Sequence, residues 1–434
     1  MSLTRFLRNR RASVVPMLGI SLVPLIAGIG AAVDYSRAST VRSSMQAAGD
    51  ATALMLARST SILSGNQLQQ YATTFFQANF NRPEAQNLQV TASYAQGAGG
   101  FTVTVNGSAT VAPIFMRALG FSQIPLTTTG SVNWNNSKLR VALVLDNTGS
   151  MSQYGKMTAL KTAAKNLLSQ LQQAAQSNGD VYVSIIPFAK DVNVGPANYN
   201  QPWIEWSGAS DTWDEHNGTC SNQTYTNKSS CTSHGKTWTP KNHNTWNGCV
   251  MDRDQNYDTT NTAPGVGSTL FPAEQYAYCP VPLMGLSYDW TALNAKIDAM
   301  APNGGTNQAI GLQWGFQSLT NLPFSVPPLN PNYQYKQIII LLTDGLNTQD
   351  RWYGNGSNPS PQVDARQQIL CSNIKAAGIT VYTVQVNTDG DPTSTLLQQC
   401  ASDSSKFFLL TSANQIVTTF DTIGTSLTVL HLSR

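Results

Sequence analysis

Three short segments of the sequence carry oxygen-bearing side chains at the ends of predicted elements. Asp146, Thr148 and Ser150 follow the apolar run VALVL, Thr306 lies in PNGGTNQA, and Asp344 ends QIIILLTDG. Two carboxylates and three hydroxyls make an all-oxygen set, which suits a hard divalent cation such as Mg²⁺, Mn²⁺ or Ca²⁺. Zinc and iron prefer histidine or cysteine ligands, which these segments lack. We refer to the five residues as the oxygen cluster.

Each segment also has a simpler interpretation. Thr148 or Ser150 could cap a helix that begins near Gly155, and Thr306 could cap the helix that follows it. Asp344 and the glycine after it could form an ordinary turn. The order of the three segments favours a shared site, because ligands of open α/β sheets bind beyond the carboxyl ends of the strands.

From Lys138 onward the sequence alternates between strand and helix patterns. KLRVALVL is almost continuously apolar, as in a strand buried on both faces, and apolar residues at helical spacing follow from Met157 to Ala175. The runs VYVSIIPF, QIIILLTDG and ITVYTVQV predict further strands between predicted helices. Repeated strand–helix units predict an α/β fold with a doubly wound, mostly parallel sheet over residues 138–434.

Residues 195–288 interrupt this alternation and fit neither period. The segment holds five tryptophans: Trp203, Trp206, Trp213, Trp238 and Trp246. They could contact a glycan or a partner protein, since tryptophan favours interfaces. The interpretation we favour is structural, with tryptophans and disulfides replacing a core in a disulfide-rich insert.

The cysteines are even in number and all lie after residue 200. They are Cys220, Cys231, Cys249, Cys279, Cys371 and Cys400. None forms a CxxC pair, so zinc is not favoured, and an oxidising compartment suits them. We expect sequential pairing, most firmly Cys371 with Cys400, although the sequence leaves the connectivity open.

Residues 14–33 read VVPMLGISLVPLIAGIGAAV and contain no charge. A helix of this length rises about 30 Å, enough to cross a bilayer. Four arginines precede it, so we expect residues 1–13 in the cytoplasm, residues 14–33 as a single transmembrane anchor, and the bulk of the chain outside. A cleaved secretory signal is the alternative, but its apolar core would be unusually long.

The sequence pattern of residues 34–135 predicts helices followed by a small sheet. DYSRASTVRSSMQAAGDATALMLARS predicts a long helix that leaves the membrane, and a second helix follows from Gln67. Alternation of apolar and polar residues predicts strands at 87–94, 101–105 and 126–134. This α+β region precedes the larger α/β domain.

Composition and motifs exclude several function classes. Outside the N-terminus, basic and acidic residues nearly balance, which argues against nucleic-acid binding. No GxSxG elbow or Walker loop is present, and the four histidines lie at 216, 234, 243 and 431, away from the oxygen cluster in sequence. We therefore expect no enzyme, although a metal-dependent hydrolase and a structural periplasmic spacer with a vestigial site stay open as alternatives.

The order D-x-T-x-S-M, then GGT, then a strand ending in TDG resembles the von Willebrand factor type A fold, which is Rossmann-like. That family's metal-ion-dependent adhesion site (MIDAS) uses D-x-S-x-S with a distant threonine and aspartate. The resemblance implies that Asp146, Thr148, Ser150, Thr306 and Asp344 bind Mg²⁺, Ca²⁺ or Mn²⁺ and that a partner's carboxylate completes the coordination. Thr148 stands where the family usually has serine, and it keeps the hydroxyl.

The N-terminal region resembles the TadG-like proteins of bacterial tight-adherence (Flp) pilus systems. The similarity lies in the arginine-flanked anchor that runs into GAAVDYSRASTVRSSMQAAGDATAL. It implies a single-pass inner-membrane protein that acts in pilus assembly, with its bulk in the periplasm or beyond and other pilus components as partners. No Gly-x-x-x-x-Glu precedes the apolar stretch, so prepilin-type processing is not expected.

Overall fold

The computed structural model describes residues 14–57, 65–97, 100–134, 137–175, 177–208, 211–320, 323–331 and 333–432. The chain divides into two compact units, residues 1–136 (with residue 434) and residues 137–433. The cytoplasmic segment expected at 1–13 lies outside the described residues.

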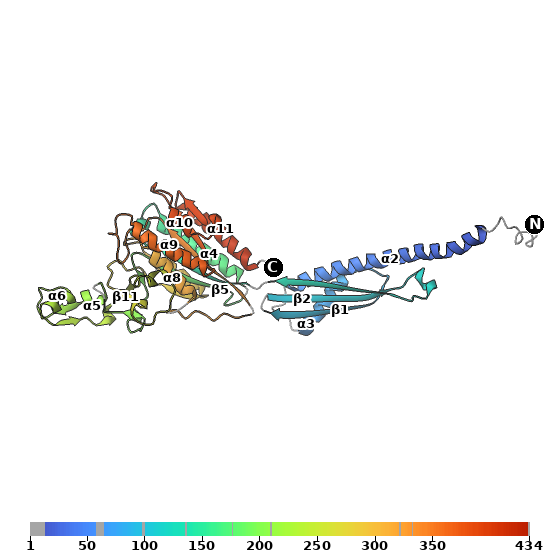
Figure 1. Cartoon of the computed structure of the whole chain (residues 1–434), viewed down its shortest axis with the longest axis horizontal. Helices are drawn as coiled ribbons and strands as arrows, with labels where there is room; N and C mark the ends of the chain where they lie inside the picture. Colours follow the sequence, from blue (N-terminus) through green and yellow to red (C-terminus); the bar gives the residue numbers. More distant parts are fainter. Residues whose placement is uncertain are drawn as a thin grey trace, which may run out of the picture. The chain divides into compact units, whose positions relative to one another are not determined.

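The first unit packs one long helix and one short helix on a three-stranded antiparallel sheet (Figure 1). Its elements are α2 (Val14–Ala57), α3 (Gly65–Asn79), β1 (Ala85–Gly97), β2 (Gly100–Val111) and β3 (Ile124–Trp134). Helix α2 continues without a break from the apolar stretch into the folded unit, where Val41 and Met45 are fully buried against Phe76 of α3 and Val103 of β2. Its apolar part is long enough to cross a membrane by length and composition.

The second unit is built on a mixed sheet of ten strands in the order β15-β14-β13-β4-β5-β6-β10-β11-β7, with β12 paired to β5. Five neighbouring strands are parallel: β4 (Ser137–Asp146), β5 (Val181–Phe188), β13 (Gln334–Thr343), β14 (Thr380–Val386) and β15 (Phe407–Leu410). The predicted mostly parallel α/β sheet is therefore confirmed. The chain winds from β4 to β5 on one side and from β13 to β14 on the other, so strand order reverses between β4 and β13.

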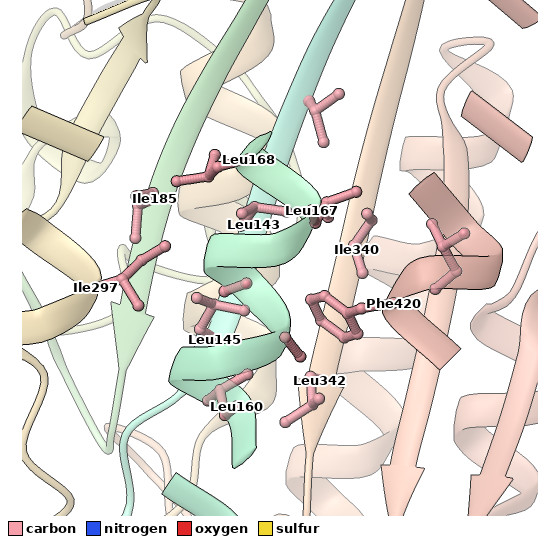
Figure 2. Packing of buried hydrophobic residues seen from close by; sticks show 14 of the residues in the cluster. Leu143, Leu145, Leu160, Leu167, Leu168, Ile185, Ile297, Ile340, Leu342 and Phe420 are labelled. Atoms are coloured by element: carbon pink, nitrogen blue, oxygen red, sulfur yellow. The ribbon is translucent and has the colours of Figure 1, made fainter. Parts of the chain in front are cut away.

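Helices cover both faces of this sheet. Their bounds are α4 (Lys156–Ala174), α7 (Trp290–Ala299), α8 (Gln308–Thr320), α9 (Pro361–Ala376), α10 (Thr395–Cys400) and α11 (Asn414–Leu432). Side chains alternate along β4: Leu143 and Leu145 face α4, α7 and α11, whereas Ala142 and Val144 face α8, α9 and α10. Figure 2 shows Leu160 of α4 and Phe420 of α11 packed with these leucines. The alternation explains why the strand sequence is apolar throughout.

Residues 195–288 extend the sheet with short strands and carry a small two-stranded sheet of their own. Strand β6 (Val192–Asn193) lies just before the segment, and the elements within it are β7 (Ile204–Glu205), α5 (Trp213–His216), β8 (Gly218–Cys220), α6 (Lys228–Ser233), β9 (Trp238–Pro240), β10 (Cys249–Val250), β11 (Phe271–Glu274) and β12 (Met284–Ser287). Trp213 and Trp246 are buried and contact Trp206 edge to face, which favours the structural interpretation of the tryptophans.

The six cysteines form three disulfides in sequential order. The pairs are Cys220–Cys231, Cys249–Cys279 and Cys371–Cys400. The predicted pairing is therefore confirmed. Two bridges staple residues 195–288, and the third joins α9 to α10 on one face of the sheet.

Candidate functional site

Asp146 and Asp344 lie at the carboxyl ends of the neighbouring strands β4 and β13. This is the point where strand order reverses, the usual ligand position in doubly wound sheets. Both side chains are buried. The backbone N–H of Thr148 donates to Oδ1 of Asp146 (2.8 Å), and the hydroxyl of Thr343 donates to its Oδ2 (2.7 Å).

Ser150 links the turn after β4 to the end of β13. Its hydroxyl donates to Oδ1 of Asp344 at 2.7 Å and lies 3.1 Å from Oγ1 of Thr148. Helix α4 begins after Gly155, with no side-chain capping bond, so neither hydroxyl serves as the cap that the simpler interpretation assigns to it. The hydroxyls instead join the two strand ends.

The loop that carries Thr306 reaches the same place through its glycines. The backbone N–H of Gly149 donates to the carbonyl of Gly304 at 3.0 Å. Gly304 has φ +86, and a Cβ there would lie 2.6 Å from the Tyr276 hydroxyl, so both conformation and space require glycine. A Cβ built on Gly345 would lie 3.9 Å from Oγ of Ser150 and 4.0 Å from Oγ1 of Thr306, so both hydroxyls approach that glycine.

The residue that caps α8 is Asn307, not Thr306. Its Oδ1 accepts the backbone N–H of Ile310 at 3.1 Å. The structure therefore brings Thr306 beside the other members of the oxygen cluster and leaves it no capping role. All five residues meet at one edge of the sheet; that they bind a cation stays a prediction.

Lys156 is a charged neighbour that the sequence patterns did not single out. Its ammonium is fully buried and lies 2.7 Å from Oδ2 of Asp344 and 2.8 Å from Oδ2 of Asp389, which follows β14. Burial opposes the charge, but the hydrogen bonds and charges of the two aspartates outweigh it and raise the pKa of Lys156. A lysine in the first turn of a helix opposes the helix dipole, and this could have signalled a strong anionic partner.

The site has more negative charge than its own donors neutralise. Burial and the neighbouring charge of Asp344 raise the pKa of Asp146 to about 7, against the hydrogen bonds from Thr148 and Thr343 that lower it. Carboxylate and hydroxyl oxygens around an uncompensated charge suit a hard divalent cation. Among the described residues no group of three or more His, Cys, Asp or Glu side chains is placed to hold a metal, so zinc-type ligation is not favoured.

A third buried carboxyl group, that of Asp252, supports the Thr306 loop. Oδ2 of Asp252 accepts the side-chain amide of Asn307 (2.8 Å) and the backbone N–H of Arg351 (3.2 Å). Burial, followed by the charges of Asp350 and Asp258, raises the pKa of Asp252 to about 8. At neutral pH this group therefore holds a proton, which keeps a further negative charge away from the loop.

The raised pKa of Asp252 predicts a pH dependence of stability. The folded protein binds a proton more tightly than the unfolded chain, so Asp252 destabilises the fold as pH rises from about 4 to about 8. Asp252→Asn should therefore gain unfolding free energy relative to wild type across this window, at roughly 1.4 kcal/mol per pH unit at most and a few kcal/mol in total. Urea unfolding in EDTA at a series of pH values measures the difference.

Asp298→Asn is the matched control, because the side-chain carboxylate of Asp298 is exposed and pairs with the exposed Lys165. The unfolding free energy of Asp298→Asn relative to wild type should stay nearly constant with pH. If the unfolding free energy of Asp252→Asn relative to wild type is also independent of pH, Asp252 is ionised at neutral pH. That result would contradict the raised pKa assigned to this group.

Two family models match the chain. The Tad family, described as Flp pilus-assembly TadE/G-like, matches residues 12–58, and the von Willebrand factor type A domain matches residues 270–422. The second match begins after β4 and the Asp146 turn, but β4 pairs with β13 residue by residue in the same parallel sheet. A comparison with curated proteins found no match.

Solved structures with a similar fold include proteins from bacterial pili and from mussel. The pilus adhesin SpaC from Lactobacillus rhamnosus GG is 15% identical with a TM-score of 0.36, and the alignment covers 81% of this chain and only 36% of SpaC. The vWF domain of the type V pili tip protein Mfa5 from Porphyromonas gingivalis is 10% identical with a TM-score of 0.38, covering 67% of this chain and 95% of that domain.

The third is proximal thread matrix protein 1 from the mussel byssus, solved with a zinc-occupied MIDAS motif. It is 14% identical with a TM-score of 0.34, and the alignment covers 68% of this chain and 46% of that protein. These low similarities concern the fold alone, so the assignment rests on the two family models. The chain carries a TadE/G-like N-terminal segment and a von Willebrand factor type A domain.

Proposed function

We propose that this chain is a membrane-anchored, exported component of bacterial tight-adherence (Flp) pilus assembly. In this proposal it binds protein partners, other pilus components among them, through a divalent cation held by the oxygen cluster. The observation that carries the proposal is the meeting of Asp146, Thr148, Ser150, Thr306 and Asp344 at one edge of the sheet. The TadE/G-like segment supports the pilus context, and the apolar part of α2 supports the anchor.

The charges around the site favour a divalent cation over a monovalent one. Asp146, Asp344 and Asp389 carry three negative charges when ionised, and Lys156 contributes one positive charge, so two negative charges are left. A cation such as Mg²⁺ supplies two positive charges, and Ca²⁺ or Mn²⁺ would match equally well. Lys156 binds Oδ2 of Asp344, which leaves Oδ1 and its Ser150 partner on the side of the other hydroxyls.

The cation would join the domain to a carboxylate of its partner. Ser150 and Gly345 are half-buried, whereas Asp146, Thr306 and Asp344 are buried, so a ligand can reach the cluster on the side of Ser150 and Gly345. Two anionic groups repel each other unless a cation lies between them. Partner binding should therefore depend on the cation and reverse when it is removed.

Lys156 supports one alternative function. A buried ammonium that already neutralises Asp344 is what a periplasmic spacer with a vestigial site would need. A hydrolase has less support, because the hydrogen bonds and ring contacts of His234 and His243 are made within residues 195–288 and not with the oxygen cluster. Cation binding separates the adhesive function from the spacer.

The first prediction of the adhesive proposal concerns the cluster itself. In the full chain in detergent, Mg²⁺ should raise the melting temperature of wild type, and Asp146→Ala should lose this rise because its carboxylate is gone. Thr306→Val removes one hydroxyl with little change of shape and should weaken the rise. Calorimetric titration of Mg²⁺, with circular dichroism as the folding control, provides the affinities.

Partner capture should follow the same pattern. Wild type should retain pilus components in Mg²⁺ and release them in EDTA, and both variants should capture less. Equal Mg²⁺ affinity in wild type and Asp146→Ala would refute the site. Cation binding without any carboxylate-bearing partner would refute the adhesive role and retain the site.

A second prediction concerns Lys156. Lys156→Met leaves Asp344 buried without its ammonium partner, which should cost about 3–5 kcal/mol of unfolding free energy in EDTA. Mg²⁺ should then raise the melting temperature of this variant more than that of wild type, because the uncompensated carboxylates attract the cation more strongly. Thermal unfolding with and without Mg²⁺ measures both effects.

Lys165→Met is the matched control on the same helix, since Lys165 pairs with Asp298 on the surface. It should change stability by less than about 1 kcal/mol and leave the Mg²⁺ effect as in wild type. If Lys156→Met responds to Mg²⁺ no more than wild type does, the lysine and the cation do not share a charge balance, and the spacer alternative gains support.

A further inference from the structure

The loop between β2 and β3, residues 112–123, exposes an apolar surface in the first unit. Four large side chains of this loop are largely exposed: Ile114 (60%), Phe115 (47%), Leu119 (55%) and Phe121 (53%). Arg117 is the only charged residue in the segment. Single exposed apolar side chains are normal on proteins, but four within eight residues form a patch that needs an explanation.

A buried aspartate fixes this loop to the long helix α2. The carboxylate of Asp34 accepts the backbone N–H groups of Ile114, Phe115 and Met116, each at 2.8 Å. Asp34 is 1% exposed, so these bonds are shielded from water. The loop is therefore held in one position on the helix and is not a free tip.

Close packing one turn earlier reinforces the attachment. A Cβ built on Gly30 would lie 2.5 Å from Cβ of Phe115, so only glycine allows the loop to approach this closely. Phe115 thus lies against the helix at the end of its charge-free stretch. On the same part of α2, Ile26, Ile29 and Val33 are 54%, 59% and 42% exposed.

The loop and the helix therefore expose apolar side chains at the same level. Gly30 and Asp34 follow Val14 by 16 and 20 positions, or about 24 and 30 Å along a helix, which is close to the far side of a bilayer's hydrocarbon core. Arg117 is long enough to reach the headgroups from this level. The apolar surface of the loop continues the surface that the helix offers to lipid.

We propose that residues 112–123 insert into the interfacial layer of the membrane that α2 crosses. The occupant of the apolar patch is lipid, because the patch is continuous with the apolar helix surface and is fixed to it by Asp34. The loop then gives the first unit a second membrane contact. Two contacts fix the depth and rotation of α2, and the three-stranded sheet is held close to the bilayer.

Fluorescence of the full chain in phosphatidylcholine–phosphatidylglycerol vesicles tests the proposal. An environment-sensitive NBD group is attached to Leu119→Cys or to Phe121→Cys, both at exposed positions. Ser93→Cys, on the exposed face of β1 far from the loop, is the aqueous control, and Ile26→Cys on α2 is the membrane control. The cysteines of wild type are all in disulfides, so the label reports one site.

The emission of the Leu119 and Phe121 labels should shift to the blue in vesicles, and lipids with a shallow spin label should quench it. Lipids with a deeply placed spin label should quench the Ile26 label most. Neither the shallow nor the deep spin label should quench the Ser93 label. Emission at Leu119 and Phe121 that matches the Ser93 control would overturn the proposal. Shielding of the loop labels only after other proteins are added would overturn it too, and would identify the patch as a protein interface.

Discussion

The buried carboxylates of Asp146 and Asp344 impose the main electrostatic constraint on the site of the larger unit. Asp146 and Asp344 end neighbouring parallel strands, so the topology of the sheet forces them together. Their repulsion is strong because little water screens it. The sequence around them supplies donors: the Thr148 amide, the hydroxyls of Thr343 and Ser150, and the ammonium of Lys156.

These donors do not remove the charge, and this explains the character of the site. The pKa of Asp146 stays raised to about 7, because burial and Asp344 outweigh the hydrogen bonds. Two buried carboxylates side by side repel each other, and the donors around them leave part of that charge uncompensated. The oxygen cluster therefore offers the charge and the oxygen ligands that our proposal of a bound cation requires.

The smaller unit uses a buried carboxylate in a different way. Asp34 accepts three backbone N–H groups and so converts a loop into a fixed attachment on α2. Here three N–H donors of one loop and the guanidinium of Arg37, whose Nη1 lies 4.0 Å from Oδ1 of Asp34, compensate the charge. Comparing Asp34 with Asp146 indicates that the surrounding groups, and not burial alone, decide how far the charge of a buried carboxylate is compensated.

That the five residues of the oxygen cluster lie close together could be predicted from the sequence, because apolar runs mark the ends of strands and parallel strands end at one edge of the sheet. The three-stranded sheet of the first unit was predictable from the alternation of residues along its strands. The sequential disulfides agree with our expectation, although the sequence alone left the connectivity open. The ion pairs of Lys156 and the hydrogen bond between Asn307 and Asp252 were not predictable, since these partners are distant in sequence and are brought together only by the packing of the strands and loops. The contact of Phe115 with Gly30 also depends on tertiary structure.

Anomalous diffraction from crystals grown with Mn²⁺ is the most direct measurement of the central claim. The predicted result is a single strong manganese peak coordinated by Ser150 and Thr306, with Asp146 and Asp344 bound directly or through water and Lys156 still paired to Asp344. Mn²⁺ absent from this edge of the sheet, or bound only at acidic groups elsewhere, would contradict the assignment of the oxygen cluster as a cation site.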